Sequence, residues 1–316
     1  MENAQAVLVG LQSATGIGAK TLWSILEAAR DNGVPLSEVP DMNSEALREQ
    51  LKVTGRIAAA IEASDWETAA STWQRLAAIG TQVVTILDDA YPSRLVNQLD
   101  RDAPPMLYVK GNTDLLNVPG IGFSGSRKAS EAGLAHTTQL VQQSVERGMM
   151  VISGHAGGVD AVAHKAAVDA GGQTALAIPE GILKFQMRAE LREAYDESPE
   201  LFVVVSEFLP GIPWSGRNAM ARNRIILGMS DVTCIIEAGT SGGTWNAGVT
   251  ALKLNIPSFV LQYDNPPDSA EGNIRLIERG AIPIPADETG IQLPGIMPTV
   301  DKPIQPGLFD HDTNND

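Results

Sequence analysis

Apolar segments alternate with helix-like stretches over about half of this chain, and this alternation restricts the fold more than any other feature. Strands that are apolar almost throughout are typical of a parallel sheet covered on both faces. The sequence therefore predicts an α/β fold, an extended and doubly wound Rossmann-like parallel sheet. The apolar runs are 119–124, 149–153, 174–178, 202–206, 232–237 and 257–261. The helical stretches are 130–147, 159–170, 186–195, 218–229, 244–254 and 271–279.

The segments on either side of this pattern differ from it. Residues 6–80 have apolar residues at helical spacing, and Thr15–Leu22 contains the Gly-apolar-Gly turn of a helix-hairpin-helix. Such a turn can hold a DNA phosphate, or it can serve packing and dimerisation. Two short β-like runs, at 83–87 and 105–109, are expected to extend the main sheet.

These shifts predict three parts. Residues 1–80 form a small helical N-terminal domain of helix-hairpin-helix or SAM-like type, and residues 81–285 form the extended Rossmann-like domain. Residues 286–316 are rich in proline and polar residues, so we expect a disordered tail.

The charge distribution limits what the chain can bind. The net charge is −15, which argues against a broad, non-specific nucleic-acid binder. Residues 120–230 are the least acidic part, with 10 Lys and Arg against 11 Asp and Glu. Any site for a polyanion is therefore expected to be a focused pocket in this part of the chain.

The cysteine count and the lack of long apolar runs indicate the cellular compartment. Cys234 is the single cysteine, so no intrachain disulfide can form, which fits a reducing cytoplasm. It lies within an apolar β-run and is expected to be buried rather than reactive. No apolar run reaches the length of a membrane span, and no basic segment of a secretory signal opens the chain. We expect a cytoplasmic protein with no membrane partner.

Glycine-rich loops follow three of the predicted strands, at 125–127, 153–160 and 237–244. Glycine allows backbone N–H groups to approach an anion closely, and the N-terminus of the next helix adds favourable partial charge. In an open α/β sheet such loops meet at the carboxyl edge of the strands. The sequence therefore predicts a phosphate-binding pocket there.

Basic and hydroxyl side chains near these loops are the candidate ligands. Arg127 can grip a phosphate with its guanidinium while the Ser124 and Ser126 hydroxyls complete the cradle, although it could instead tie neighbouring loops together. Arg222 and Arg224 point in different directions on one helix, so one is expected to pair with Glu207. Arg222 is expected to face the cleft.

Other polar residues have two possible roles. Asp160 and His164 lie one helical turn apart, after His155, and we expect a structural pair rather than a metal site because no further ligands have suitable spacing. Thr244 can act as a helix N-cap, as a phosphate ligand, or as both. No Ser/His/Asp arrangement predicts nucleophilic catalysis, and neither a metal nor a cofactor is expected.

These residues together resemble the DNA-processing protein A (DprA/Smf) family. The resemblance rests on Tyr91-Pro92, Pro105–Gly111, the glycine loops at 125–127 and 153–160, Ser206-Glu207, Arg222–Ile226 and Gly280-Ala281. It implies an extended Rossmann fold that binds single-stranded DNA without catalysis, hands it to the recombinase RecA, and forms a homodimer. The implied binding residues are Ser124, Gly125, Ser126, Arg127, Lys128, Gly154, His155, Gly157, Gly158, Arg222, Ser241, Gly242, Gly243 and Thr244.

The chain also departs from the family pattern. Gly157 stands where the family usually has an arginine, and the loop at 179–184 lacks the usual Tyr-Pro…Asn sequence. The loop at 241–246 is closer to the LOG-type nucleotide phosphoribohydrolases, yet the glutamate of those enzymes is absent. No winged-helix segment follows the core. The resemblance is therefore to a divergent member.

Three functions remain open on the sequence. The first is a non-enzymatic single-stranded DNA-binding protein of recombination, natural transformation or mobile-DNA processing. The second is a small-nucleotide sensor or hydrolase in the same cleft, with Glu207 and Glu237 as candidate acid and base. The third is a scaffold that acts mainly through its helical N-terminus and its tail, which would dock onto the sliding clamp through Gln305, Leu308 and Phe309.

Overall fold

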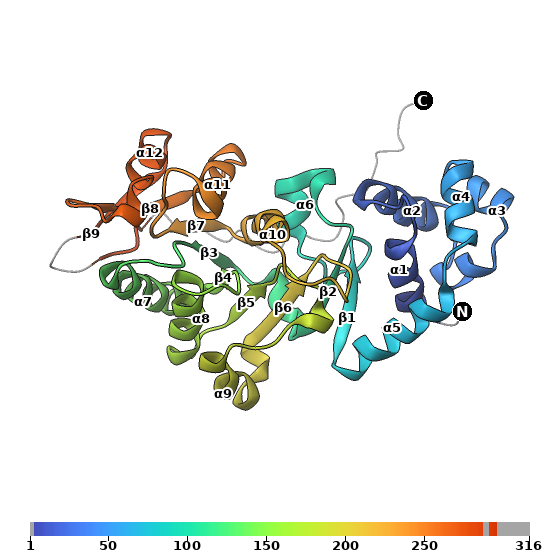
Figure 1. Cartoon of the computed structure of the whole chain (residues 1–316), viewed down its shortest axis with the longest axis horizontal. Helices are drawn as coiled ribbons and strands as arrows, with labels where there is room; N and C mark the ends of the chain where they lie inside the picture. Colours follow the sequence, from blue (N-terminus) through green and yellow to red (C-terminus); the bar gives the residue numbers. More distant parts are fainter. Residues whose placement is uncertain (1–2, 287–290, 296–316) are drawn as a thin grey trace, which may run out of the picture.

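The computed structural model describes residues 3–286 and 291–295, and these contain one nine-stranded sheet flanked by helices. The strands lie in the order β1-β2-β6-β5-β4-β3-β7-β8-β9 (Figure 1). All neighbours from β6 to β9 pair in parallel, so the predicted doubly wound α/β fold is confirmed. The strands are β1 Thr81–Thr85, β2 Met106–Gly111, β3 Gly120–Ser124, β4 Met150–Ser153, β5 Thr174–Ala177, β6 Phe202–Ser206, β7 Val232–Ile235, β8 Ser258–Tyr263 and β9 Ile282–Ala286.

Helices cover both faces of the sheet. Neighbouring residues of a strand point to opposite faces, so Val151 packs in the cluster under α7 and α8, while Ile152 packs in the cluster under α6 and α10. The helix α9 lies on the first face, and α11 and α12 lie on the second. Their bounds are α6 Ser93–Leu99, α7 Glu131–Glu146, α8 Val159–Asp169, α9 Ala189–Glu197, α10 Gly216–Met229, α11 Gly242–Lys253 and α12 Asn273–Glu278.

The predicted extension of the sheet is also present. β2 joins the parallel strands through antiparallel pairing with β6, and β1 adds to β2. Five helices then pack at this end of the sheet and share an apolar cluster with Val83, Met106 and Tyr108 (Figure 1). The expected helical N-terminal region is therefore confirmed. Its helices are α1 Ala4–Ser13, α2 Ala19–Asp31, α3 Ser44–Gln50, α4 Gly55–Glu62 and α5 Trp66–Ala78.

The order of the strands fixes where a ligand can bind. From β3 the chain builds β4, β5 and β6 on one side, and it then crosses to β7, β8 and β9 on the other. The strand order thus reverses between β3 and β7, and the loops that follow these two strands diverge there. In open α/β sheets this reversal creates the crevice that holds ligands.

Two expectations about the C-terminal part need correction. β9 was not expected because Pro283 and Pro285 interrupt its pattern, but proline is tolerated on an edge strand, and β9 pairs only with β8 in the described sheet. Disorder from residue 286 onward is wrong for residues 291–295. There Ile291 and Leu293 are buried in the cluster under α7, and Arg147 donates to the Leu293 carbonyl at 2.8 Å.

The structure does not describe the residues of the remaining prediction for this part of the chain. The residues predicted to bind the sliding clamp, Gln305, Leu308 and Phe309, lie outside the described residues. Within residues 3–286 and 291–295, none of the helices has the length and apolar content needed to cross a bilayer.

Candidate phosphate-binding site

The loops after β3 and β4 interlock through glycine. A Cβ at Gly125 would lie 2.4 Å from Val159 Cγ2, and a Cβ at Gly158 would lie 2.4 Å from the Ser126 carbonyl oxygen. Gly158 also has a φ of +71°, and the Val159 N–H donates to the Ser126 carbonyl at 3.3 Å. Glycine is therefore needed for close backbone approach, and the first two predicted loops meet as expected.

The loop after β7 joins them from the other side of the switch point. The Ile236 N–H donates to the Ser124 carbonyl at 3.0 Å. The Asn223 side chain on α10 donates to the Gly243 carbonyl at 3.3 Å. The three glycine loops and the Arg222–Arg224 segment are thus brought together at the carboxyl edge of the parallel strands.

A buried charged cluster lies beneath the 153–160 loop. A Cβ at Gly154 would lie 2.0 Å from Arg222 Nη1 and 2.3 Å from Asp160 Oδ2, so both charged groups face the same point. Arg222 Nη1 donates to the Ala177 carbonyl at 2.5 Å. Burial raises the pKa of the Asp160 carboxyl, and the Arg222 guanidinium opposes this rise.

This arrangement corrects one prediction. Arg222 does not face an open cleft, because only 6% of it is exposed and its guanidinium lies behind Gly154. The expected pairing of the other arginine with Glu207 is confirmed, because Arg224 donates to the Glu207 carboxylate. The burial of Arg222 depends on Asp160, which lies far away in sequence, so helical spacing alone could not reveal it.

His164 is a buried structural histidine, as expected. Its Nε2 lies 2.5 Å from the Gly154 carbonyl, and its Nδ1 lies 2.6 Å from the Thr174 hydroxyl. A carbonyl only accepts, so Nε2 carries the proton and donates. Burial lowers the pKa of His164 to about 4. The imidazole therefore ties α8 and the 153–160 loop to β5 in its neutral form.

His155 lies on the same loop, and its ring packs against Phe185 at 5.0 Å between ring centroids. Burial lowers the pKa of His155 to about 4, and electrostatic interactions with His164, Arg188 and Arg222 add to this effect. Arg188 was not expected from the sequence. It precedes α9 and is electrostatically close to His155, a proximity created by the sheet rather than by local sequence.

Arg127, in the 125–127 loop, and Lys128, which follows it directly, are exposed basic residues. The Lys128 N–H donates to the Ser126 hydroxyl at 3.0 Å, which shapes the turn. Among the described residues neither side chain forms an ion pair, and the Arg127 guanidinium lies 5.9 Å from the ring centroid of Trp214. Arg127 therefore projects from the loop with its charge available to a ligand.

The 237–244 loop opens α11 in a way that differs from one prediction. The helix begins at Gly242 and its N-cap is Ser241, so Thr244 lies in the first turn and is not the cap. The Ser241 side chain forms no capping hydrogen bond. The first N–H groups of a helix have no partner within the helix, and these can bind an anion.

The two carboxylates considered for catalysis are both engaged. Glu237 is fully buried and accepts hydrogen bonds from the Ser130 and Ser269 hydroxyls at 2.5 Å and from the Tyr263 hydroxyl at 3.1 Å. Glu207 is paired with Arg224 through one oxygen, its other oxygen is buried without a hydrogen-bond partner among the described residues, and burial raises the pKa of its carboxyl. Neither group is placed as a free acid or base beside the loops.

The expected burial of Cys234 is confirmed. This burial raises the pKa of its thiol. Within the described ranges, no cluster of three or more His, Cys, Asp or Glu side chains could hold a metal ion.

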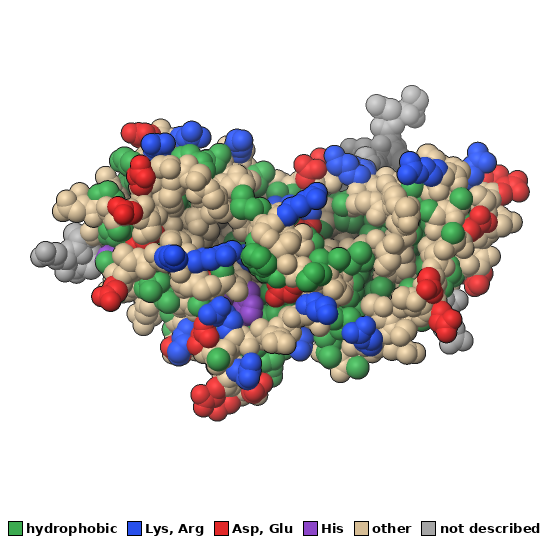
Figure 2. All heavy atoms as spheres, viewed as in Figure 1, with side chains coloured by type: hydrophobic (Ala, Val, Ile, Leu, Met, Phe, Trp, Pro, Cys, Tyr) green, Lys and Arg blue, Asp and Glu red, His purple; other side chains and the backbone are tan. Residues whose placement is uncertain are grey.

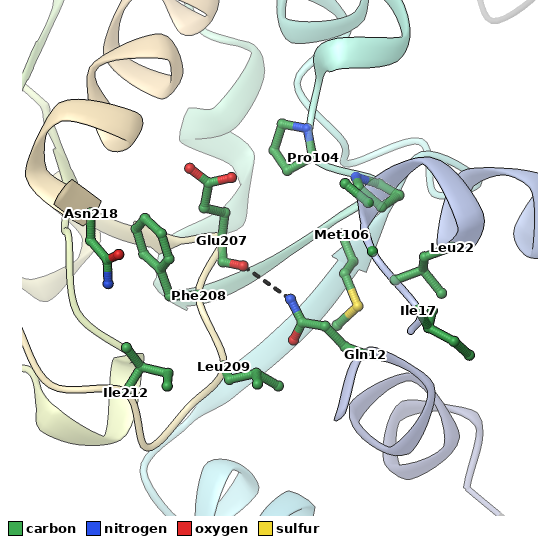
Figure 3. Close-up of a pocket in the computed structure, with 13 residues that line it drawn as sticks. Gln12, Ile17, Leu22, Pro104, Met106, Glu207, Phe208, Leu209, Ile212 and Asn218 are labelled. Carbon is green, nitrogen blue, oxygen red and sulfur yellow. Dashed lines mark hydrogen bonds between the residues drawn. The ribbon is translucent and has the colours of Figure 1, made fainter. Parts of the chain in front are cut away.

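A cavity of about 360 Å³ lies next to the site, between the N-terminal helices and the segment that follows β6. Figure 3 shows Ile17 and Leu22 on one side, Phe208 and Ile212 on the other, and Gln12 between them. Gln12 donates to the Glu207 carbonyl at 3.0 Å, and it accepts from the Tyr108 hydroxyl at 2.6 Å. This network fixes the helices relative to the sheet edge.

The charge on this face matches the geometry. Figure 2 shows Lys and Arg side chains around the middle of the face, where α8 and α10 lie in Figure 1. Most acidic side chains in view lie nearer the periphery. Basic side chains therefore gather on the part of this face where α8 and α10 lie.

Comparisons with known proteins identify the family and similar folds. A sequence model of the family described as DNA recombination-mediator protein A matches residues 82–292. The DNA processing protein DprA of Streptococcus pneumoniae is 34% identical over 197 residues, which cover 62% of this chain and 68% of that protein. Protein Smf of Synechocystis is 29% identical over 225 residues, 70% of this chain and 56% of that protein. The chain thus aligns with only about half to two thirds of these relatives.

Solved structures are similar as well. The X-ray structure of DprA from Streptococcus pneumoniae has a TM-score of 0.73 at 24% identity and covers 90% of this chain and 94% of that one, which supports the fold. A second structure concerns the single-stranded DNA binding mode of DNA processing protein A from Helicobacter pylori. It has a TM-score of 0.55 at 27% identity and covers 64% of this chain and 90% of that one.

Proposed function

This chain belongs to the DNA recombination-mediator protein A family, and we propose that it binds single-stranded DNA without catalysing a reaction. The observation that carries the proposal is the meeting of three glycine loops around Arg127 at the switch point. The Helicobacter pylori relative, which binds single-stranded DNA, supports the choice of ligand. The strand would run over the loops with its phosphates toward backbone N–H groups and Arg127.

The remaining parts of the function follow from the family resemblance. We propose that the protein acts in DNA recombination, natural transformation or mobile-DNA processing, as a cytoplasmic homodimer that hands the strand to RecA. We also propose that the tail at Gln305, Leu308 and Phe309 docks onto the sliding clamp.

The geometry favours binding over nucleotide hydrolysis in the same cleft. Glu207 pairs with Arg224, and Glu237 accepts hydrogen bonds from three hydroxyl groups. A general acid or base must reach the reacting group with an accessible oxygen, and the Glu207 oxygen that has no hydrogen-bond partner in the described part of the chain is buried. A small-nucleotide sensor or hydrolase therefore stays the second candidate, and turnover of any nucleoside monophosphate would favour it.

Fluorescence anisotropy with a short labelled oligothymidylate tests the proposal. The affinity is expected to fall steeply with salt, by a slope of about 0.7 for each phosphate neutralised. Arg127→Ala should weaken binding by about 1–3 kcal/mol, because a charge-assisted contact is lost.

Arg279→Ala is the matched control. Arg279 is also exposed and lies over a tryptophan ring, 5.2 Å from the Trp245 centroid, but on α12's C-terminal side. Its removal should leave the affinity almost unchanged. A wild-type protein that binds no oligonucleotide at low salt would reject the proposed function.

A further inference from the structure

Exposed large apolar side chains concentrate beside the candidate site. Five such side chains occur among the described residues, and three of them lie between β6 and the middle of α10. These are Ile212, Trp214 and Met220, with exposed fractions of 37%, 56% and 39%. Single exposed apolar residues are common on protein surfaces, whereas a group of them next to a polar site indicates an interaction surface.

Two of the three side chains reach the glycine loops on different sides. Trp214 lies under the Arg127 guanidinium of the 125–127 loop, with 5.9 Å between the Arg127 Cζ and the ring centroid. The sulfur of Met220 lies 3.6 Å from the position of a Cβ on Gly243, in the 237–244 loop. The apolar surface therefore runs alongside the predicted phosphate contacts.

Ile212 continues this surface toward the N-terminal helices. It also lines the cavity of about 360 Å³, together with Phe208 and Asn218 (Figure 3). The backbone N–H of Asn218 donates to the Ser215 hydroxyl at 3.1 Å. For the side-chain amide of Asn218, the structure gives no hydrogen bond within the described residues. Apolar contact area and a free amide thus occur in one continuous region.

We propose that Ile212, Trp214 and Met220 form a base-binding surface, with Trp214 as the stacking platform for an unpaired nucleobase. The proposal rests on the proposed function, because the strand's phosphates are taken to lie on the glycine loops. An aromatic ring beside a cationic groove is the arrangement that single-stranded nucleic acids recognise, since every base has a π-face.

The charge of the surroundings favours this occupant over an apolar protein partner. Arg127, Lys128 and Arg217 are exposed around the surface, and none of them forms an ion pair within the described part of the chain. A polyanion whose apolar groups face one way and whose charges face the other fits both features. In a duplex the bases are stacked on each other and cannot reach Trp214, so this surface selects a single strand.

The test compares two ligands of equal length, an oligothymidylate and the corresponding abasic strand, at one salt concentration. The wild-type protein should bind the oligothymidylate more tightly. Trp214→Ala should weaken binding of the oligothymidylate by about 5- to 100-fold and leave binding of the abasic strand nearly unchanged. Trp214→Phe retains an aromatic face and should keep most of the affinity.

Ile274→Ala serves as the matched control, because Ile274 is a similarly exposed apolar residue, at 50%, on α12. It should change neither affinity. Equal binding of the oligothymidylate by Trp214→Ala and the wild type would overturn the inference while leaving the proposed function intact. Equal weakening of both ligands would also overturn it, since that result assigns Trp214 to positioning Arg127. Self-association that is lost in Trp214→Ala with DNA affinity unchanged would assign the surface to a second copy of the chain.

Discussion

The candidate site has a buried floor and an open rim, which hold their arginines in opposite ways. In the floor, Arg222 is 6% exposed, faces Asp160 and donates to a backbone carbonyl. In the rim, Arg127 is exposed and touches only an exposed tryptophan among the contacts that the structure gives for its guanidinium. The floor therefore shapes the 153–160 loop, and the rim is left to contact a ligand.

This difference separates two kinds of binding residue. A buried arginine cannot move toward a strand without leaving the Asp160 carboxylate and breaking its hydrogen bond with the Ala177 carbonyl. An exposed arginine can reorganise around each phosphate at little structural expense. We therefore expect changes in the floor to alter stability, and changes in the rim to alter affinity at nearly constant stability.

The largest expected effect comes from Arg222→Leu. It removes the buried cation beside Asp160, and an uncompensated buried charge destabilises a protein by about 3–5 kcal/mol. Arg127→Ala should change the free energy of unfolding by less than about 0.5 kcal/mol. Urea denaturation of both variants measures the contrast. Similar stability losses in the two would contradict the division into floor and rim.

The glycine positions of the 153–160 loop give the next largest effect. Gly158→Ala places a Cβ 2.4 Å from the Ser126 carbonyl at a φ of +71°, so we expect a loss of about 1–3 kcal/mol. Gly157→Ala is the control, because a Cβ there meets nothing within 4 Å. Thermal melts of the two variants should separate clearly. Equal melting temperatures would show that the two loops do not interlock in solution.

Lowering the pH should reduce the free energy of unfolding, because His164 becomes protonated only in the unfolded chain at mildly acidic pH. Its folded pKa of about 4 lies below the ordinary value of 6.5, so the unfolded chain binds more protons between these values. The stability contributed by the neutral imidazole is therefore present above about pH 6.5 and is lost as the pH falls toward 4. Between pH 7 and pH 5 the wild type should lose about 1–2 kcal/mol more than His164→Gln. His155 remains in both proteins, and since burial is the largest cause of its low pKa, most of its titration cancels in the difference. Parallel pH profiles would contradict this role.

Much of the fold could be predicted from sequence because its signals are local. The apolar runs located β3 to β8, and glycine marked the loops that follow β3, β4 and β7. β9 was missed because prolines hide an edge strand from a local pattern. The packing of Ile291 and Leu293 under α7 was missed for a related reason, since nothing in a proline-rich segment reveals its partner.

The segments that form the site could be predicted from the sequence, but the burial of each side chain could not. Spacing correctly separated Arg222 from Arg224, yet it could not show which of them is buried deeper. That depends on Asp160, which the sheet brings near Arg222 from another strand-end loop. Trp214 gave no signal either, because its contact with Arg127 joins the segment after β6 to the loop after β3, three strands away in the sheet. Long-range neighbours, rather than residue types, were the missing information.

The smallest expected effect is a gain of affinity for DNA from a change in the 153–160 loop. Gly157 stands where the related family usually has an arginine, and the space around it is open, so Gly157→Arg adds a cation without a clash. One additional phosphate contact should steepen the salt slope by about 0.7 and strengthen binding by about 1 kcal/mol. Stability should stay within about 0.5 kcal/mol of the wild type, because the new side chain is placed on the surface. Anisotropy titrations at several salt concentrations provide the slope, and Gly157→Gln controls for side-chain size. An unchanged slope would place the strand's phosphates away from this loop and leave the rim alone to bind them.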